Sequence, residues 1–377
     1  MKIYIYVDNY SPQGDDFTYG GIRKVVDGFA AGLVACGAEV IVLCEGSQES
    51  IFQTTSGYKI ACFANTSHEL WFDVPKKFQK YLYENAKDSL VILNGVFHRR
   101  VYALSRFLKK NQIAYIVAPH EPYHPALFQK NAHLKWPYWY LLEKRMLKHA
   151  RAIQLLDIRH AKYLNSLQVN TPFLEVPNGF SITELHSDSD FEWREKGIPK
   201  LFFFGRIDVY HKGLDLLLDA FAEVTEVCNC QLTIQGPDWG ERKELEAKSA
   251  HLGLSRRVFF IEPDFDKSPP LIIAEYDIFC ISSRFEGFSL SALEAMLAGR
   301  VLLVSEVAGI APHVQKSGCG VLIKPEISSI KAGIIELLEC RSQWQEMGLR
   351  GRQYVLENLH WHKIASRTLE QYKSLMA

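Results

Sequence analysis

Short apolar runs, mostly four or five residues long, recur along the whole chain, and amphipathic stretches separate them. The runs are rich in β-branched and aromatic residues, and they are continuous rather than alternating. Because a strand inside a parallel sheet is buried on both faces, such runs predict parallel strands. The runs are Ile3–Val7, Val40–Leu43, Leu90–Leu93, Ala114–Val117, Ala152–Leu155 and Phe173–Val176 in the first half, and Leu201–Phe204, Gln231–Ile234, Val258–Ile261, Ile278–Ile281, Val301–Val304 and Val321–Ile323 in the second.

The stretches between the runs have the period of amphipathic helices. Leu214, Leu217, Leu218, Phe221 and Val224, for example, repeat at the spacing of one helix face. Strands that alternate with helices form doubly wound α/β sheets. The chain has 377 residues, a length that suits two domains of roughly 150–200 residues each. The pattern therefore predicts an α/β protein with two doubly wound domains.

The boundary between the two domains is expected near Val176–Gly179. The segment Ser181–Pro199 that follows is polar and has no period, which is typical of a linker. We expect an N-terminal domain over residues 1–180 and a C-terminal domain over residues 181–361. A last helix, at about residues 362–377, could cap either domain, and packing back on the first is one of the two options.

Charge is distributed unevenly although the formal net charge is zero. Residues 1–180 hold 21 basic and 15 acidic residues, whereas the remainder holds 22 and 28. The excess is concentrated in Phe97–Arg151, which has 11 basic residues against Glu121 and Glu143. This bias indicates an anionic partner for the N-terminal half, such as a lipid headgroup or a phosphorylated acceptor, and a solvated basic face is the alternative. No nucleic-acid partner is expected.

The cellular location is predicted from the lack of a signal peptide and of a membrane-spanning stretch in the sequence. The first apolar run stops at Asp8, too early for a signal peptide, and no stretch approaches the roughly 20 apolar residues of a membrane span. Eight scattered cysteines without a Cys-x-x-Cys motif indicate free thiols in a reducing compartment. We therefore expect a cytoplasmic protein.

Peripheral contact with the inner face of the membrane is a second expectation. The segment His98–Lys110 places apolar residues on one helix face with basic residues around it, and such a helix can lie on anionic lipid. Lys135–Tyr140 adds aromatic residues of the kind found at membrane interfaces. The alternative is a helix packed in the core with its basic residues solvated.

Candidate chemistry lies in three loops that follow predicted strands, where helix N-termini of parallel α/β proteins meet ligands. In the first, Gly20 and Gly21 precede a helix expected at Val25–Leu33. In the second, Arg206 leaves a strand end and Lys212 stands where a helix is expected to start. A helix N-terminus disfavours cations, so this placement predicts an anion between the two side chains.

The third loop, Ser283–Glu294, carries two acids eight residues apart. Gly287 permits a sharp turn, and a helix is expected over Ser289–Ala298. The first N–H groups of that helix can hold a phosphate. Glu286 precedes the helix, and Glu294 lies inside it, where a carboxylate can accept from two ribose hydroxyls.

These motifs, in this order, resemble those of glycosyltransferase family 4. Glu286 and Glu294 match its E-x7-E element, Gly205–Gly213 resembles its G-R…K-G element, Val176–Gly179 resembles its interdomain P-N-G, and Gly20-Gly21 resembles its N-terminal glycine loop. Pro119–Pro122, with the basic aromatic segment after it, is similar to the bacterial exopolysaccharide branch. The resemblance implies a GT-B fold, with two Rossmann-like domains facing across a cleft.

The resemblance also implies a role for each residue. Arg206 and Lys212 would hold the diphosphate of a nucleotide sugar, together with Gly20, Gly21 and the N–H groups of Phe288, Ser289 and Leu290. Glu294 would bind ribose. His120 and Glu286 would be the catalytic residues that contact the donor sugar, and Glu262 and Pro263 would lie near the base. The chain departs from the family at Ser289, where a second glycine is frequent, and at Gly309–His313, which lacks the usual Pro-Glu.

The function implied is that of a retaining hexosyltransferase. It would move a sugar from a nucleotide-diphosphate sugar, with UDP favoured, to a saccharide or lipid-linked saccharide in exopolysaccharide biosynthesis. No cofactor or metal is expected, because two cations and a helix N-terminus would neutralise the diphosphate. The acid pairs Asp188/Asp190 and Asp264/Asp266 are interpreted as coincidental. The alternatives are a nucleotide-sugar epimerase on the same fold and a non-catalytic nucleotide-sugar-binding protein.

Overall fold

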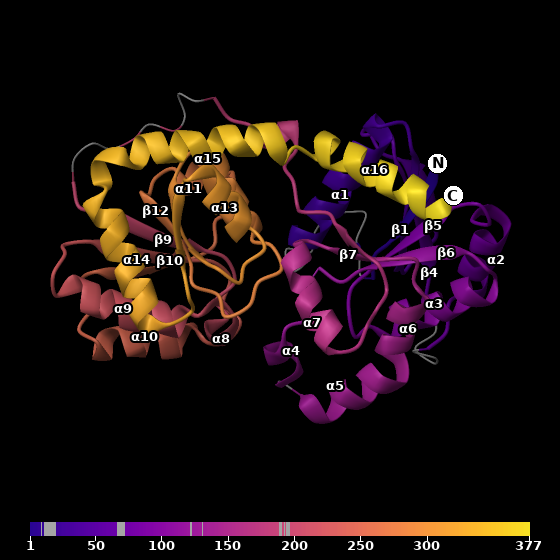
Figure 1. The fold of residues 1–377 in the computed structure, drawn as a ribbon, viewed down its shortest axis with the longest axis horizontal. Helices are drawn as coiled ribbons and strands as arrows, with labels where there is room; N and C mark the ends of the chain where they lie inside the picture. The colour runs from indigo at the N-terminus through magenta and orange to yellow at the C-terminus, as the bar shows by residue number, and fades with distance from the viewer. Residues whose placement is uncertain are drawn as a thin grey trace. The chain divides into compact units, whose positions relative to one another are not determined.

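The chain folds into two compact units, seen here in a computed structural model that describes residues 1–8, 10, 20–65, 72–120, 123–129, 131–187, 191, 193 and 197–377 (Figure 1). Unit 1 consists of Met1–Gly179 and His360–Ala377, and unit 2 of Phe180–Leu359. Among the helices of these described residues, none combines the length and the apolar character that a membrane crossing requires.

Unit 1 is built on one sheet with the strand order β3-β4-β2-β1-β5-β6-β7-β8. All neighbouring strands are parallel except β3 and β4. The strands are β1 (Lys2–Tyr6), β2 (Glu39–Gly46), β3 (Ser50–Gln53), β4 (Lys59–Ala64), β5 (Leu90–Asn94), β6 (Ala114–Ala118), β7 (Ile153–Leu155) and β8 (Phe173–Glu175). The helices are α1 (Gly20–Ala35), α2 (Lys76–Asn85), α3 (Arg99–Lys110), α4 (Pro125–Gln129), α5 (Ala132–Tyr138), the π-helix η2 (Trp139–Glu143), α6 (Lys144–His149), α7 (Ala161–Ser166) and α16 (Trp361–Met376).

The last helix of the chain, α16, packs against α1 of unit 1, so the question that the sequence left open is answered. Two glycines of α1 allow the contact. A Cβ atom at Gly28 would lie 2.1 Å from Nε1 of Trp361, and one at Gly32 would lie 2.8 Å from the Trp361 carbonyl oxygen. Further along α16, the Tyr372 hydroxyl donates to the side chain of Gln154 in β7.

Unit 2 is built on a second sheet, fully parallel, with the strand order β11-β10-β9-β12-β13-β14. The strands are β9 (Lys200–Phe204), β10 (Gln231–Gln235), β11 (Val258–Ile261), β12 (Ile278–Ile281), β13 (Val301–Ser305) and β14 (Gly320–Ile323). The helices are α8 (Val209–Lys212), α9 (Leu214–Thr225), α10 (Arg242–His251), α11 (Pro269–Ile273), α12 (Leu290–Leu297), α13 (Ala311–Ser317), α14 (Ile327–Glu339) and α15 (Trp344–Asn358). Helices α9, α10 and α14 pack together as one layer, and α11, α12, α13 and α15 as another.

The prediction of two doubly wound α/β sheets is confirmed, since each predicted run is a strand in the structure. Two strands of unit 1 were not predicted. β3 is exposed along its whole length and pairs antiparallel with β4 at the edge of the sheet. An exposed edge strand has no need of a continuous apolar run, and the sequence of β3 therefore lacks the pattern used to find the others.

The helix predicted at His98–Lys110 is α3, and its apolar face belongs to the core. Val101, Leu104 and Leu108 are at most 1% exposed and pack in the core cluster of unit 1. Trp139, one of the aromatic residues expected at an interface, is fully buried as well. The proposal that α3 lies on lipid is therefore wrong in its stated form, because the apolar face that would enter the lipid is already covered.

The π-helix η2 places a carboxyl group in the core of unit 1. Glu143 is fully buried, and its Oε1 accepts from the Tyr123 hydroxyl at 2.7 Å and from the Phe97 N–H at 3.1 Å. Its Oε2 has no hydrogen-bond partner within the described residues. Burial raises the pKa of Glu143 from its ordinary value of 4.5 to about 7, although both hydrogen bonds act in the opposite direction.

We expect Glu143→Gln to stabilise the protein more at pH 8 than at pH 5. The unfolded carboxyl ionises near pH 4.5 and the folded one near pH 7, so the wild type loses stability as the pH rises through this window. Glutamine does not titrate, and its relative advantage should grow by about 3 kcal/mol across the window. Thermal unfolding of both proteins at each pH measures the difference. A difference between the two proteins that does not change with pH would contradict the account.

Candidate functional site

The loops after β9 and β10 run side by side at the carboxyl edge of the unit 2 sheet. Gly205 and Gly236 both have positive φ angles, 154° and 151°. A Cβ atom at Gly236 would lie 1.9 Å from the carbonyl oxygen of Gly205, so only glycine permits this approach. The Ile207 N–H donates to the carbonyl of Pro237 at 2.9 Å and ties the two loops together.

Arg206 lies between Gly205 and Ile207, and its side chain contacts an aromatic ring rather than a carboxylate. Its guanidinium lies 4.3 Å from the centroid of the Trp239 ring. Within the described part of the chain it makes no ion pair. A cation–π contact orients the guanidinium while leaving its N–H groups able to bind an anion. The sequence prediction missed Trp239, although an aromatic residue just after a strand end was a usable sign.

The helix that the sequence predicted near Leu214 is α9, which begins at Leu214. Lys212 lies two residues before it, at the C-terminal end of the short helix α8, which was not predicted. The reason is Asp208, whose carboxylate accepts the His211 N–H at 3.1 Å and caps one additional helical turn. The helix then ends at Gly213, which has φ 64°. The Ser282 hydroxyl, after β12, donates to the Lys212 carbonyl at 2.9 Å and fixes the position of the lysine backbone.

Lys212 forms an ion pair with Glu286, and this pair brings together two of the predicted site residues. Nζ of Lys212 lies 2.6 Å from Oε2 of Glu286, with side-chain exposures of 14% and 8%. Burial by itself would raise the pKa of Glu286, but the Lys212 ammonium and His211 lower it below its ordinary value. Glu286 is therefore ionised at neutral pH. The anion expected between Arg206 and Lys212 is a different one, and it stays a prediction.

The two oxygens of Glu286 differ in what they contact. Oε2 accepts from Lys212 and, at 3.3 Å, from the Ser283 hydroxyl. Oε1 has no hydrogen-bond partner in the part of the chain that the structure describes. One oxygen therefore holds the lysine in place, and the other can accept a hydroxyl of a ligand.

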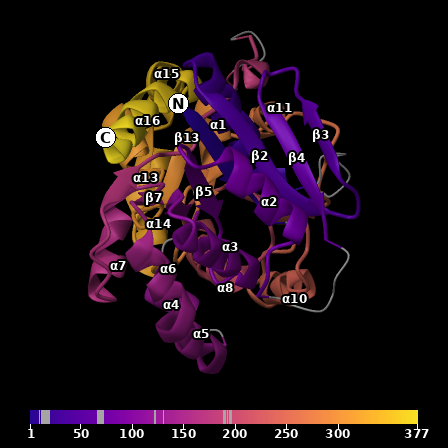
Figure 2. The ribbon, with the colours of Figure 1, turned by 90° about the vertical axis from the view of Figure 1, so that its right-hand side faces the viewer.

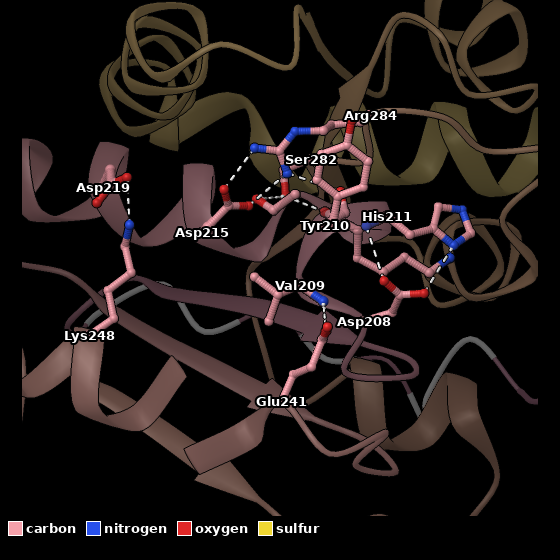
Figure 3. A network of polar contacts seen from close by, with 12 residues as sticks. Asp208, Val209, Tyr210, His211, Asp215, Asp219, Glu241, Lys248, Ser282 and Arg284 are labelled. Atoms are coloured by element: carbon pink, nitrogen blue, oxygen red, sulfur yellow. Dashed lines mark hydrogen bonds and ion pairs between the residues drawn. The ribbon is translucent and has the colours of Figure 1, made fainter. Parts of the chain in front are cut away.

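A polar network supports the loop that carries Lys212 (Figure 3). Arg284 makes a bidentate pair with Asp215, at 2.8 and 2.7 Å, and donates to the Tyr210 carbonyl at 2.9 Å. On the other side, the Val209 N–H donates to Glu241 at 2.6 Å. Hydrogen bonding from His211 lowers the pKa of Asp208 to about 2. Arg284 thus positions the loop and is not available to a ligand.

The N-terminus of α12 presents unpaired N–H groups at the same edge of the sheet. Ser289 caps the helix, and its hydroxyl accepts the Ala292 N–H at 3.2 Å. The N–H groups of Leu290 and Ser291 donate to no acceptor within the described residues, so they can bind an anion. Phe288 precedes the cap, and Glu294 lies in the second turn of the helix with 6% exposure.

The two glycines of the first predicted loop are part of a helix instead. Gly20 and Gly21 form the first turn of α1, which begins five residues earlier than the expected start at Val25. The correction has a simple reason. The N–H groups of a first turn need no partner inside the helix, so glycine can begin a helix without the loss of internal hydrogen bonds. Those N–H groups keep the orientation that an anion requires.

His120, after β6, has a strained backbone and a fixed ring. Its φ of 62° lies in the left-handed region, which is uncommon for residues other than glycine and frequent at functional sites. Its Nε2 lies 2.7 Å from Oδ1 of Asn94, whose Nδ2 donates to the Tyr6 carbonyl at 2.9 Å. Because Asn94 uses its oxygen for the contact, Nε2 carries the proton and Nδ1 is an acceptor.

Burial lowers the pKa of His120 from 6.5 to about 4, so the ring is neutral at physiological pH. A neutral ring with an unprotonated Nδ1 can accept a hydrogen bond from a hydroxyl at that atom but cannot donate one there. Asn94, which was missed in the sequence prediction, is the positioning residue for this ring. It follows a buried strand and precedes Gly95, so its place at the carboxyl edge of the sheet could have been found from the sequence.

Glu262 and Pro263 follow β11 at the edge of the unit 2 sheet. The Glu262 carboxylate is 80% exposed and pairs with Arg242. Its backbone carbonyl accepts from the Gln235 side chain at 2.9 Å. The contact expected between Glu262, Pro263 and a base stays a prediction.

Among the described residues, no cluster of three or more His, Cys, Asp or Glu side chains could hold a metal ion. Asp264 accepts the N–H groups of Asp266 and Lys267, at 3.0 and 3.2 Å, and so forms a local turn. Asp188 and Asp190, the other acid pair, lie outside the described residues, as does Glu121.

Comparison with known proteins agrees with this geometry. Residues 187–354 match the family model described as "Glycosyl transferases group 1". The MMP alpha-(1->4)-mannosyltransferase of Mycolicibacterium hassiacum is 27% identical over 246 residues, which are 63% of this chain and 58% of that relative. The chain thus spans somewhat more than half the length of this relative.

Solved structures define the fold. The sucrose-phosphate synthase of Thermosynechococcus elongatus superposes with a TM-score of 0.77 at 18% identity, over 99% of this chain and 98% of that one. The Anabaena protein Alr3699/HepE, solved in complex with UDP and glucose, superposes with a TM-score of 0.72 at 17% identity, over 99% and 100%. The chain has the GT-B fold. The residues that match the family model lie within unit 2. The name of the mannosyltransferase relative agrees with the predicted class of enzyme, a hexosyltransferase.

Proposed function

We propose that this protein is a retaining glycosyltransferase of family 4 type. It transfers a hexose from a nucleotide-diphosphate sugar to a saccharide or lipid-linked saccharide in exopolysaccharide biosynthesis. The observation that carries the proposal is the Lys212–Glu286 pair, at 2.6 Å, on the sheet edge that also presents Arg206 and the N-terminus of α12. Two cations and a helix N-terminus suit a diphosphate, and a buried carboxylate with one unused oxygen suits a sugar hydroxyl.

The proposed donor contacts divide along the same lines. Arg206, Lys212 and the N–H groups at Phe288–Leu290 bind the diphosphate, with Gly20 and Gly21 contributing N–H groups from unit 1. Glu294 binds ribose. Glu286 and Nδ1 of His120 accept hydroxyls of the donor sugar. UDP is favoured as the nucleotide, and the Anabaena neighbour that was solved with UDP supports this choice.

The proposed reaction breaks the bond between the anomeric carbon and the leaving phosphate oxygen. The electron pair goes to that oxygen, and Arg206 and Lys212 stabilise the growing charge. The acceptor hydroxyl attacks from the same face, and its proton passes to the leaving phosphate. This route retains the anomeric configuration without a covalent sugar–enzyme intermediate, and the two cations fulfil the charge-neutralising role that a metal would otherwise have.

A panel of nucleotide sugars tests the proposal. We expect one of them, a UDP-sugar first, to raise the melting temperature of the full chain and to release nucleoside diphosphate slowly in water. The Glu286→Gln variant should lower the turnover roughly 10²-fold, and mass spectrometry should find no sugar on the protein. Glu226→Gln, an exposed control in unit 2, should behave as the wild type.

Three outcomes would separate the alternatives. A stable sugar–protein adduct would contradict the same-face route. Conversion of the nucleotide sugar without release of nucleoside diphosphate would indicate an epimerase. Binding without any turnover, for every sugar and acceptor offered, would indicate a binding protein.

A further inference from the structure

His211 stands next to Lys212 on the short helix α8 (Figure 2), and the donor contacts proposed above give it no role. Its side chain is 9% exposed. The His211 carbonyl accepts the Arg284 N–H at 3.0 Å. Its ring lies flat on the ring of Phe285, with centroids 4.2 Å apart and an angle of 10° between the planes. His211 therefore joins the lysine of the site to the two residues that directly precede Glu286.

The plane of the His211 ring is set by Asp208, which caps α8. One oxygen of the Asp208 carboxylate accepts the His211 backbone N–H at 3.1 Å, and the other lies 3.6 Å from Nδ1 of the ring (Figure 3). An ionised carboxylate can only accept, so it favours a proton on the ring nitrogen that faces it. Nε2 is buried and has no hydrogen-bond partner within the described residues. The ring is therefore held by Asp208 and by its stack on Phe285, and not through Nε2.

The two ends of the Lys212–Glu286 pair are anchored differently. The backbone of Lys212 has a support of its own, because its carbonyl accepts the Ser282 hydroxyl at 2.9 Å. Glu286 directly follows Phe285, which is 9% exposed and rests with one face of its ring on His211. A shift of the Phe285 ring would therefore move Glu286 while the backbone of Lys212 stayed in place.

We propose that His211 is a positioning residue of the donor site. Its ring, held by Asp208, supports the Phe285 ring and thereby keeps Glu286 in place beside Lys212. The flat ring is the part of His211 that matters, because aromatic rings attract each other when they stack at this distance. A small displacement of a group that contacts the substrate slows a reaction strongly. The expected effect on turnover rests on the proposed function, whereas the expected effect on the position of Glu286 does not.

Turnover of a UDP-sugar tests the proposal. We expect His211→Leu, which removes the ring and keeps an apolar side chain, to lower kcat roughly 10–10²-fold. UDP, which does not contact Glu286 in the proposed function, should bind almost as tightly as to the wild type. A variant that was merely destabilised would not show this split. His211→Phe provides a ring that can stack and should recover most of kcat. The control His251→Leu changes an exposed histidine at the end of α10 and should behave as the wild type.

The other ring of the stack provides an independent variant. Phe285→Leu should lower kcat about as much as His211→Leu. The double variant His211→Leu/Phe285→Leu should be no slower than the slower single variant, because two residues that act through one contact do not have additive effects. If His211→Leu does not fold, Phe285→Leu and His211→Phe carry the test. Additive losses in the double variant would contradict the proposal.

Crystal structures of the wild type and of His211→Leu, both without ligand, test the position of Glu286 directly. We expect the 2.6 Å contact between Lys212 and Glu286 to be lost in the variant, and the bond from the Ser282 hydroxyl to the Lys212 carbonyl to be kept. An unmoved Glu286 in the variant, wild-type kcat in His211→Leu, or an equal loss in His211→Phe would each overturn the proposal. Absence of turnover in the wild type would instead count against the proposed function, and the two crystal structures would still decide the role of His211.

Discussion

Replacing Lys212 by alanine is expected to lower kcat/KM for sugar transfer by roughly 10²–10³-fold, the usual effect of removing one group that stabilises charge in a transition state. The reason is twofold. The variant loses the ammonium that neutralises the leaving diphosphate. It also leaves Glu286, with a side chain only 8% exposed, without its cation at 2.6 Å. An unpaired carboxylate at that position would repel the diphosphate that Lys212 attracts.

The ion pair should also matter for stability. Breaking a buried pair by removing one partner typically costs about 3–5 kcal/mol, so Lys212→Ala should melt at a lower temperature than the wild type. The double variant Lys212→Ala/Glu286→Gln should recover part of the melting temperature but none of the activity. Lys248→Ala is the matched control, since it removes a Lys–Asp pair of 2.7 Å with greater exposure in the same unit. Wild-type kcat/KM in Lys212→Ala would refute the role given to this lysine.

The second large effect is expected at Gly213, between α8 and α9. This residue has φ 64°, and a Cβ atom there would lie 2.2 Å from the carbonyl oxygen of Ser282. The carbonyl oxygen belongs to the backbone, and the position of a Cβ atom is fixed by its own backbone, so neither atom can move aside cheaply. Strain in the left-handed region and forced overpacking each cost about 1–3 kcal/mol. We therefore expect Gly213→Ala to lower the free energy of unfolding of unit 2 by about 2–6 kcal/mol and to displace Lys212.

Gly253 provides the control for this prediction. It has a similar φ of 74°, but a Cβ atom there would have nothing within 4 Å. Gly253→Ala should show only the conformational strain, at most about half the effect of Gly213→Ala. Thermal unfolding with and without a nucleoside diphosphate measures both variants. Equal losses at the two glycines would mean that contact with Ser282 is not what requires glycine at position 213.

The fold could be predicted from the sequence because each strand and helix is marked by a pattern in its own neighbouring residues. A strand buried on both faces must be apolar throughout, and the runs at β1, β9 and β12 carry this pattern without help from distant residues. The helix period of α9 is local in the same sense. β3 lacked the pattern because its side chains face solvent, and the start of α1 was displaced because glycine gives no periodic signal.

The arrangement of the candidate site could not be predicted in this way, because its residues lie far apart in the sequence. The Arg284–Asp215 pair joins residues 69 positions apart, and the Lys212–Glu286 pair joins residues 74 positions apart. No spacing rule connects them, since they meet only when the loops after β9 and β12 reach the same edge of the sheet. The orientation of His120 was hidden for the same reason, because it depends on Asn94 and, through it, on the Tyr6 carbonyl. The roles of these residues in binding remain predictions.

Isothermal titration of nucleoside diphosphates into the full chain tests the central claim most directly, because it measures the diphosphate grip without reference to the sugar or the acceptor. The account predicts that UDP binds the wild type, that Arg206→Ala and Lys212→Ala each weaken binding at least tenfold, and that Lys248→Ala leaves it unchanged. GDP and ADP in parallel titrations show whether the base contributes. Failure of all three nucleotides to bind, or equal affinity in the wild type and in Arg206→Ala and Lys212→Ala, would contradict the account.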